Sequence, residues 1–379
     1  MLQIVPTLDT GGAERTTIDI VKALKAEGWS ALVASRGGRL AYELRENGGE
    51  LIRMDAASKD LRTIFANVAR FAQLIRERNV ALIHARSRAP AWSALFAARR
   101  MRIPFVTTYH GIYQAKNPFK RWYNSVMARG DAVIANSQWT AEHIRASYPR
   151  RAKRLVVIPR GIDLAAFNPE TVASERVAKL RADWHARPDE RVILLPGRLS
   201  RWKGQLVLLG ALEQLQRGDR LPEGVRVIIA GDAQGREFYV RELNDAIARG
   251  DLHGVAQVTG HIEDMAAAYC AADIVVSAST DPEAFGRVPP EAAAMGRPVI
   301  ATDHGGARET VLPGQSGLLV IPSNRTALAD AIADLLARPR EELAQMGARG
   351  RAHILGNYTV ERMCEQTLAV YRELLAAKP

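Results

Sequence analysis

Two glutamates, Glu283 and Glu291, are eight positions apart in the stretch DIVVSASTDPEAFGRVPPEAAAMG. The first falls in a polar loop after an apolar, β-rich run. The second falls in a helix that we expect to begin near Arg287, because Pro289 and Pro290 are tolerated in a first turn. Backbone N–H groups at a helix start attract anions, and carboxylates accept hydrogen bonds from hydroxyls. The stretch therefore predicts a site for a phosphorylated sugar, although either glutamate alone could simply complement the helix dipole.

Two cations could bind the phosphates of such a sugar. Arg198 and Lys203 follow the predicted strand RVILLPG and precede a helix that Gly204 opens. Ligands of open α/β sheets usually bind at the carboxyl ends of the strands. Arginine offers a fork of donors for phosphate oxygens, and lysine offers a compact charge. Two solvated loop charges are the alternative interpretation.

The first predicted strand, LQIVP, leads into Gly11 and Gly12 and then into a helical stretch. Glycines at such a turn let backbone N–H groups approach a ligand closely. The spacing is not GxGxxG, however, and no acidic residue follows about twenty positions later, so this feature alone favours a tight turn without a dinucleotide. His110 ends another predicted strand, PFVTTYH, where a lone histidine is more often structural than catalytic.

A repeating α/β pattern must position these residues. Strand-like runs alternate with helical stretches along the chain, which is typical of parallel sheets with crossover helices. A polar stretch over 167–190 separates two series of such units. We therefore expect an α/β fold of two Rossmann-like, doubly wound parallel-sheet domains, 1–165 and 166–357. The last helical stretch, 358–379, could cap the second domain or cross back to the first.

The composition of the 379 residues, 47% hydrophobic and 25% charged, excludes a disordered or fibrous protein. Cys270 and Cys364 are the only cysteines, so neither a disulfide framework nor a cysteine zinc cluster can form. The chain begins without a signal-peptide pattern and contains no run of about 18 apolar residues. We therefore expect a cytoplasmic protein without a membrane-spanning helix.

The net charge of +11 is distributed unevenly. Residues 1–165 contain 27 lysines and arginines against 13 acidic residues, a net charge of +14, whereas the remainder has 25 against 28, a net charge of −3. Such an asymmetry favours an anionic partner: nucleic acid, lipid headgroups or a phosphorylated substrate. Solubility is the alternative explanation. The sequence contains no known nucleic-acid-binding signature, so we expect no nucleic-acid partner.

Further motifs follow in order over nearly the whole chain: GGAER, TYHG, VIANSQWTAEHI, VIPRGID, PGRLSRWKG, IIAGD, TGHIEDM and GGARETV. Together with PEAFGRVPPE, they resemble the retaining glycosyltransferases of family 4, which adopt the GT-B fold. Glu283 and Glu291 match the Glu-x7-Glu motif of that family. The chain is most similar in character to bacterial envelope-polysaccharide and lipopolysaccharide-core enzymes. Pro289-Pro290 replaces the small apolar residues of many relatives, which could shift the helix start.

The resemblance implies a role for each matched residue. Glu283 would hold hydroxyls of the donor sugar and Glu291 the ribose, while Arg198 and Lys203 would stabilise the leaving diphosphate. The implied catalytic residues are His110, Arg198, Lys203 and Glu283. The implied donor-binding residues are Gly11, Gly12, Arg198, Lys203, Glu283, Ala284, Phe285, Gly286, Arg287, Val288 and Glu291.

The resemblance also implies the reaction. A sugar would move, with retention, from a nucleotide-diphosphate sugar to an acceptor hydroxyl in a cleft between two domains that close on it. The acceptor would be a glycan or glycolipid. We expect no cofactor and no metal, because Asp281-Pro282-Glu283 is poorly placed for paired ligation and the eight histidines lack metal-binding spacing. A nucleotide-sugar epimerase on the same fold, or a non-enzymatic nucleic-acid-binding protein, is the alternative.

Two basic, aromatic segments, 87–102 and 116–129, predict peripheral attachment to an anionic membrane surface, at the inner face of the plasma membrane. In the second segment one helical flank could carry the apolar side chains, with cations near it. The apolar residues are Phe119, Trp122, Tyr123 and Met127, and the cations are Lys116, Lys120 and Arg121. The alternative is that the aromatic side chains pack into the core.

Overall fold

The computed structural model describes residues 1–9, 11–58, 60–113, 115 and 117–377. The chain forms two compact units: unit 1 comprises Met1–Gly161 and Val360–Pro379, and unit 2 comprises Ile162–Thr359. The sequence pattern had placed this junction near residue 165 and had left the destination of the C-terminal helix open. Each unit is a parallel sheet covered by helices, so the predicted α/β, Rossmann-like fold class is confirmed.

Within the described residues, the sheet of unit 1 has seven parallel strands in the order β3-β2-β1-β4-β5-β6-β7. The strands are β1 (Leu2–Ile4), β2 (Leu32–Ser35), β3 (Glu50–Arg53), β4 (Ile83–Ala85), β5 (Phe105–Tyr109), β6 (Ala132–Ala135) and β7 (Leu155–Val157). The helices are α1 (Gly12–Ala26), α2 (Ala41–Glu46), α3 (Leu61–Glu77), α4 (Arg88–Met101), α5 (Pro118–Asn124), α6 (Gln138–Ser147) and α15 (Val360–Ala376), with a 3₁₀ turn η1 (Ser125–Ala128). In register, Leu2 of β1 lies between Leu32 and Ile83. The inner strands β1 and β5 are buried along their whole length because helices cover both faces of the sheet.

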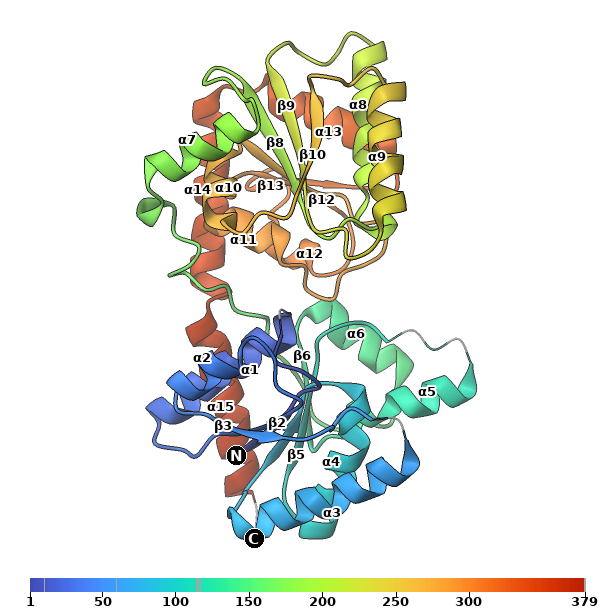
Figure 1. Cartoon of the computed structure of the whole chain (residues 1–379), viewed down its shortest axis with the longest axis vertical. Coiled ribbons are helices and arrows are strands. Elements are labelled where there is room, and N and C mark those ends of the chain that lie inside the picture. Colours follow the sequence, from blue (N-terminus) through green and yellow to red (C-terminus); the bar gives the residue numbers. More distant parts are fainter. Residues whose placement is uncertain (10, 59, 114, 116, 378–379) are drawn as a thin grey trace. The chain divides into compact units, whose positions relative to one another are not determined.

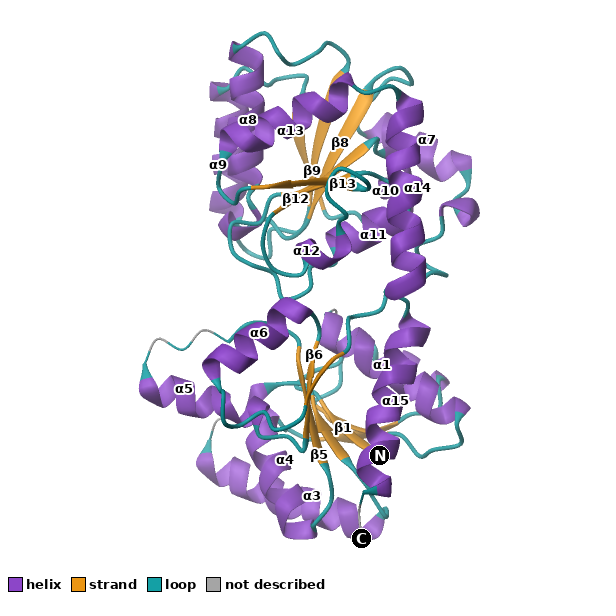
Figure 2. Ribbon diagram, turned by 180° about the vertical axis from the view of Figure 1, so that it is seen from behind, coloured by secondary structure: helices purple, strands orange, loops and turns teal. Residues whose placement is uncertain are grey.

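The C-terminal helix α15 completes the core of unit 1. Figures 1 and 2 show α15 beside α1, on the face of the sheet opposite α3 and α4. Met363 and Leu368 of α15 are buried together with Ile18 of α1. The hydroxyl of the buried Tyr371 lies 2.6 Å from Nδ1 of His84, whose Nε2 lies 2.7 Å from the hydroxyl oxygen of Thr108. A polar chain thus joins the last helix to β4 and β5.

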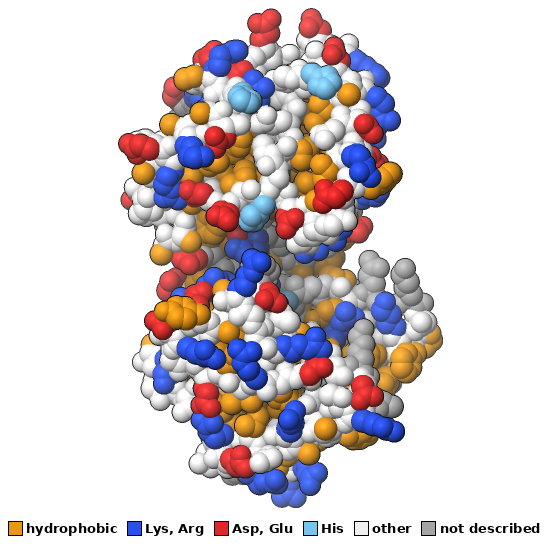
Figure 3. Space-filling view, viewed as in Figure 1, with side chains coloured by type: hydrophobic (Ala, Val, Ile, Leu, Met, Phe, Trp, Pro, Cys, Tyr) orange, Lys and Arg blue, Asp and Glu red, His pale blue; other side chains and the backbone are white. Residues whose placement is uncertain are grey.

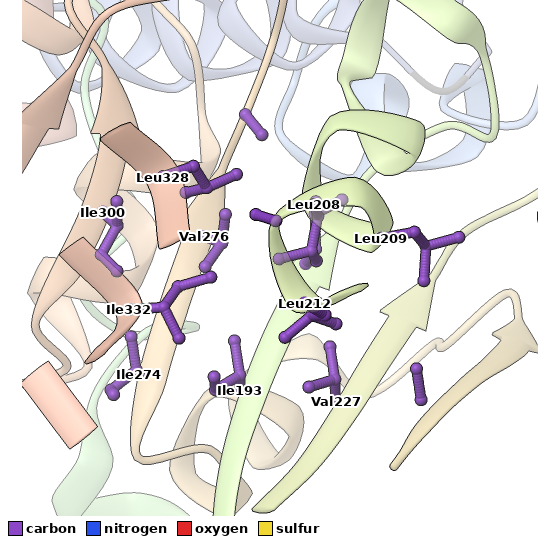
Figure 4. Close-up of a cluster of buried hydrophobic side chains, with 14 of the residues drawn as sticks. Ile193, Leu208, Leu209, Leu212, Val227, Ile274, Val276, Ile300, Leu328 and Ile332 are labelled. Atoms are coloured by element: carbon purple, nitrogen blue, oxygen red, sulfur yellow. The ribbon is translucent and has the colours of Figure 1, made fainter. Parts of the chain in front are cut away.

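The described part of unit 2 contains a six-stranded parallel sheet in the order β10-β9-β8-β11-β12-β13, the same pattern as the first six strands of unit 1. The strands are β8 (Arg191–Pro196), β9 (Val225–Ala230), β10 (Ala256–Gly260), β11 (Ile274–Ser277), β12 (Val299–Thr302) and β13 (Gly317–Val320). The α-helices are α7 (Ser174–Asp183), α8 (Gln205–Arg217), α9 (Glu237–Arg249), α10 (Met265–Ala271), α11 (Val288–Ala294), α12 (Ala307–Thr310), α13 (Arg325–Ala337) and α14 (Arg340–Asn357). Two 3₁₀ turns are η2 (Pro169–Thr171) and η3 (Arg201–Lys203). Leu208 and Leu212 of α8 and Ile332 of α13 pack against Ile193 and Val276 of the sheet (Figure 4).

The polar stretch 167–190 contains the helix α7, which the polar composition of the stretch did not predict. Val177 and Leu180 of α7 are partly buried against the core of unit 2, and Trp184 follows them at 2% exposure. The spacing of these apolar residues, three and then four positions, is that of one helical face.

No helix of the described residues is long and apolar enough to cross a membrane.

Candidate functional site

The loop after β8 presents Arg198 and Lys203 at the carboxyl end of the sheet of unit 2. The 3₁₀ turn η3 ends at Lys203, and Gly204, with φ of +76°, directly precedes α8. A Cβ atom at position 204 would lie 1.8 Å from the carbonyl oxygen of Ala278, so only glycine allows this loop to approach the end of β11. Arg198 is exposed, and its carbonyl oxygen accepts a hydrogen bond from the Gln205 amide at 3.0 Å.

Lys203 and Glu283 meet although they are far apart in sequence. The ammonium nitrogen of Lys203 lies 2.8 Å from both carboxylate oxygens of Glu283, and the two side chains are only 14% and 20% exposed. The hydroxyl of Ser279 donates to the same carboxylate at 2.7 Å. The backbone N–H of Thr280 donates to the carbonyl oxygen of Trp202 at 2.7 Å, which ties the two loops together. The predicted cation and the predicted acid therefore belong to one partly buried group.

The loop from Glu283 to Gly286 is held by its main chain. The N–H of Gly306 donates to the carbonyl oxygen of Glu283 at 3.0 Å, and Gly286 has φ of +73°. A Cβ atom at Gly305 would lie 2.3 Å from that same carbonyl oxygen. Two consecutive glycines, Gly305 and Gly306, thus let the backbone after β12 pack directly on this loop.

Within the loop, the side chains of Ala284 and Phe285 point away from solvent. Phe285 is 1% exposed and packs with Ile162, Ile354 and Tyr358 in a small core cluster. Phe285 can therefore offer a ligand only its main chain, and the role of its N–H group in binding phosphate stays a prediction. The helix α11 begins at Val288, directly after Arg287, as the prolines indicated.

Glu291 on α11 is nearly enclosed, with its side chain 8% exposed. The Tyr269 hydroxyl donates to its Oε2 at 3.0 Å, and the Arg287 guanidinium lies 2.6 Å from its Oε1. Burial, followed by the negative charge of Glu291, raises the pKa of Tyr269 well above its usual value, so the hydroxyl keeps its proton. Tyr269 and Arg287 therefore fix Glu291 as a charged acceptor at the start of α11.

A second group of site residues lies at the carboxyl end of the sheet of unit 1. Gly11 precedes α1, and a Cβ atom at Gly12 would lie 2.2 Å from Nη1 of Arg160, so the guanidinium of Arg160 covers this turn. Nη2 of Arg160 lies 3.0 Å from Nδ1 of His110, which directly follows β5. The structure therefore brings His110 and the Gly11–Gly12 turn of unit 1 together through a residue that our sequence analysis did not assign.

His110 is neutral, and its tautomer can be deduced. Burial, followed by the positive charges of Arg160 and Arg86, holds the pKa of His110 well below its usual value. Because a guanidinium can only donate, Nδ1 of His110 must accept, and the proton of the neutral ring is then on Nε2. Nε2 is buried with no hydrogen-bond partner among the described residues. His110 thus offers an N–H donor rather than a proton for general acid catalysis.

Comparison with known proteins identifies the chain. Residues 10–166 match the family model described as Glycosyltransferase Family 4, and residues 190–338 match that described as Glycosyl transferases group 1. The crystal structure of a glycosyltransferase from Rickettsia africae is 34% identical, with a TM-score of 0.90 over 99% of this chain and 98% of that chain. The chain belongs to glycosyltransferase family 4.

Further similar proteins extend this comparison. The crystal structure of Anabaena HepE in complex with UDP is 28% identical, with a TM-score of 0.84, and the match covers 98% of this chain and 99% of that chain. A relative from Segniliparus rotundus named D-inositol 3-phosphate glycosyltransferase is 33% identical over 73% of this chain. The match spans 62% of the length of that relative, and 64% of a relative of the same name from Xylanimonas cellulosilytica.

Sequence reasoning within the family pattern missed four side chains that hold the site: Arg86, Arg160, Tyr269 and Ser279. Arg86 and Arg160 each follow the end of a strand, as Arg198 does, and this position was the available signal. Ser279 follows β11 in the same way, whereas Tyr269 lies within α10 and carried no such signal, because its contact with Glu291 depends on packing. Among the described residues, no three acidic, histidine or cysteine side chains are grouped to hold a metal ion.

Segment 116–129, for which we predicted a helical flank that contacts a membrane, agrees with that prediction only in part. The helix α5 ends at Asn124, and a 3₁₀ turn follows, so the four apolar residues do not share one flank. Phe119 and Trp122 are 74% and 50% exposed, whereas Met127 is fully buried in the core of unit 1. The prediction was therefore wrong for Met127, because the turn after α5 directs it inward. Lys116 lies outside the described residues.

The buried, neutral His110 predicts a pH dependence of stability. Below the usual histidine pKa of about 6.5, the unfolded chain binds a proton that folded His110 rejects, so the free energy of unfolding falls as the pH falls. His110→Gln should reduce this dependence by up to about 1.4 kcal/mol per pH unit. Thermal unfolding from about pH 8 to about pH 5 measures it.

His253→Gln in unit 2 is the matched control, because His253 is exposed. It should leave the pH dependence unchanged. Identical pH profiles for wild type and His110→Gln would contradict the assignment of a neutral, buried His110.

Proposed function

We propose that this protein transfers a sugar, with retention of anomeric configuration and without a metal ion, from a nucleotide-diphosphate sugar to an acceptor hydroxyl. The observation that carries the proposal is the Lys203–Glu283 pair in unit 2, with Glu291 fixed eight positions further along the chain. The complexes of Anabaena HepE with UDP and with UDP-glucose support a nucleotide sugar as donor.

Charge stabilisation of the leaving group is the principal task of the cations. Lys203 is 14% exposed, and a charge in such a partly desolvated place acts more strongly on a developing phosphate charge than one in water. Arg198, exposed on the same loop, adds a fork of donors that can reach a second phosphate oxygen. Together these two side chains supply the positive charge that a divalent cation supplies in other transferases.

Glu283 is an acceptor for sugar hydroxyls rather than a nucleophile in this proposal. Its carboxylate already contacts the Lys203 ammonium and the Ser279 hydroxyl, which lowers the availability of its electron pairs for attack on an anomeric carbon. Without a protein nucleophile, retention follows when the acceptor attacks from the face that the diphosphate leaves, and a departing phosphate oxygen takes the acceptor proton. In unit 1, Nε2–H of His110 offers a hydrogen-bond donor for a ligand hydroxyl.

For the acceptor we propose a lipid-linked or lipopolysaccharide-type glycan that carries phosphate, which the enzyme meets at the inner face of the plasma membrane. The guanidinium of Arg160, 3.0 Å from Nδ1 of His110, supports an anionic acceptor. The relatives named D-inositol 3-phosphate glycosyltransferase suggest a small phosphorylated polyol as the competing acceptor. The two acceptors share a phosphate and differ in the lipid.

The test is incubation of the protein with UDP-, GDP- or ADP-sugars and either acceptor, with and without a chelator. We expect a glycoside whose anomeric configuration, read by NMR, equals that of the donor, and a rate that the chelator leaves unchanged. Conversion of donor alone into a second nucleotide sugar would instead indicate an epimerase. Strict dependence on added Mg²⁺ or Mn²⁺ would refute the metal-free mechanism.

Removal of the buried ammonium should affect the chemical step most. In Lys203→Ala, kcat should fall at least about a hundredfold, the scale of losing one donor to transition-state charge. Lys179→Ala is the matched control, since Lys179 is 76% exposed in an ion pair on α7, and it should keep wild-type kcat. A fall of less than about threefold for Lys203→Ala would overturn the proposed role.

Substitutions of the two glutamates should have different effects: Glu291 should affect nucleotide affinity, and Glu283 should affect kcat. Glu291→Gln removes the charge that Arg287 and Tyr269 hold in place, and we expect the dissociation constant of the nucleoside diphosphate to rise about tenfold. Glu283→Gln should leave that constant nearly unchanged and lower kcat. Calorimetry and steady-state kinetics measure the two effects, with the exposed Glu223→Gln as control. Equal loss of nucleotide binding in both variants would show that the separate roles are wrong.

A further inference from the structure

An apolar groove of about 750 Å³ is lined by residues of α3, α4 and α5 of unit 1. We name it the aromatic groove. Its apolar side chains come from all three helices: Ile64, Phe65, Trp92, Phe96, Phe119 and Trp122. None of these residues belongs to the group around His110 in unit 1 or to the group around Lys203 in unit 2.

The aromatic side chains of this groove face solvent to an unusual extent. Phe65 and Phe119 are 69% and 74% exposed, and Phe96 and Trp122 are 47% and 50% exposed. Apolar patches that gather exposed aromatic residues usually mark a binding surface, because a soluble protein gains nothing by exposing them. Single exposed apolar residues are common, but four around one groove are not.

The groove is preformed by contacts between its own walls. The rings of Trp92 and Trp122 stack with centroids 4.6 Å apart, and Phe119 stacks on Trp122 at 6.1 Å. Nε1 of Trp92 donates to the carbonyl oxygen of Tyr123 at 3.1 Å, so its polar atom is satisfied within unit 1. The remaining ring surfaces offer apolar contact without directional polar demands, which suits a hydrocarbon chain.

Cations border the aromatic groove. Arg88 and Lys120 line it directly. A second hollow, of about 700 Å³, shares Phe96 with it, and we name it the basic hollow. Its described lining contains a single acid, Asp131, and these cations: Arg99, Arg129, Arg150, Arg151 and Lys153.

The basic hollow keeps an excess of positive charge. Arg99 is paired with Asp131 at 2.8 Å, which neutralises one of its cations. Arg129 lies over the Trp92 ring at 5.1 Å, so the hollow and the groove share a wall. Lysine and arginine side chains are spread, with hydrophobic ones among them, over the face of unit 1 that Figure 3 presents. The charge next to the groove therefore complements an anion.

We propose that the aromatic groove binds a hydrocarbon chain of a membrane lipid, while the basic hollow holds the anionic headgroup of that lipid. The proposal rests on the proposed function in that it names the lipid surface at which the acceptor is met. Each cation close to an anionic bilayer contributes about 1 kcal/mol, so the charges of the hollow suffice for reversible attachment. Apolar burial in the groove then adds a term that salt does not screen.

The experiment is cosedimentation of the full-length protein with vesicles of phosphatidylcholine alone or of equal parts phosphatidylcholine and phosphatidylglycerol. Wild type should bind the anionic vesicles and bind less as salt rises. Phe65→Ser/Phe119→Ser should weaken this binding about tenfold by removing apolar contact. Arg150→Glu/Arg151→Glu should weaken it at least as much and abolish the salt dependence.

Phe238→Ser is the matched control, because Phe238 is 68% exposed on α9 of unit 2, and it should bind vesicles like wild type. Acyl chains that carry bromine should quench tryptophan fluorescence of wild type and not of Phe65→Ser/Phe119→Ser. All variants should retain wild-type melting temperature and the thermal shift produced by UDP.

Three results would overturn the proposal: no binding of wild type to anionic vesicles, equal binding of wild type and both double variants, or binding without bromine quenching. A dimer that dissociates in Phe65→Ser/Phe119→Ser would assign the groove to a second copy of this chain. Transfer to a soluble acceptor without vesicles tests the proposed function separately, so failure of one leaves the other measurable.

Discussion

The contact between the Lys203 ammonium and the Glu283 carboxylate is the interaction on which the organisation of unit 2 depends. Neither charge is well solvated, and each would be costly at this position without the other. The pair joins the loops that follow β8 and β11, which are neighbours in the sheet. Gly204 and the hydrogen bond from Thr280 to Trp202 bring the two backbones close enough for the side chains to meet. The order of the strands, the glycine at position 204 and the attraction of opposite charges thus all contribute to the contact between Lys203 and Glu283.

Unit 1 uses different chemistry at the corresponding edge of its sheet. Its central ring, His110, is uncharged and is oriented by a guanidinium, so the geometry is set by a donor that cannot become an acceptor. The tautomer of His110 is therefore a property of the fold and not of the solvent pH. Both units place side chains whose orientation is fixed by hydrogen bonds or ion pairs where a sugar and its phosphates could be recognised. Preorganisation of this kind avoids reordering the site during the reaction.

The sequence predicted the strands and their class because buried parallel strands are mostly apolar, as in RVILLP and VRVIIA, which contain one arginine each. It also indicated which loops carry Lys203 and Glu283. It could not show that these two side chains touch, since a contact over 80 positions depends on strand order and rotamers. Met127 illustrates the other limit: a helical flank was extrapolated through a 3₁₀ turn, which rotates the following residue into the core.

The position of α15 has a consequence for the order in which the chain acquires its structure during synthesis. Unit 1 begins at the N-terminus, yet its core is incomplete until Met363, Leu368 and Tyr371 have left the ribosome. Unit 2, Ile162–Thr359, is a continuous segment and can form first. Once it has formed, the N–H of Ile162 donates to the carbonyl oxygen of Tyr358 at 2.7 Å, so the two ends that lead into unit 1 are already neighbours. The folding of unit 2 thus offsets the entropic cost of bringing together the two ends of the segment Ile162–Thr359. Unit 1, whose N-terminal part is synthesised first, is then the last to complete its fold.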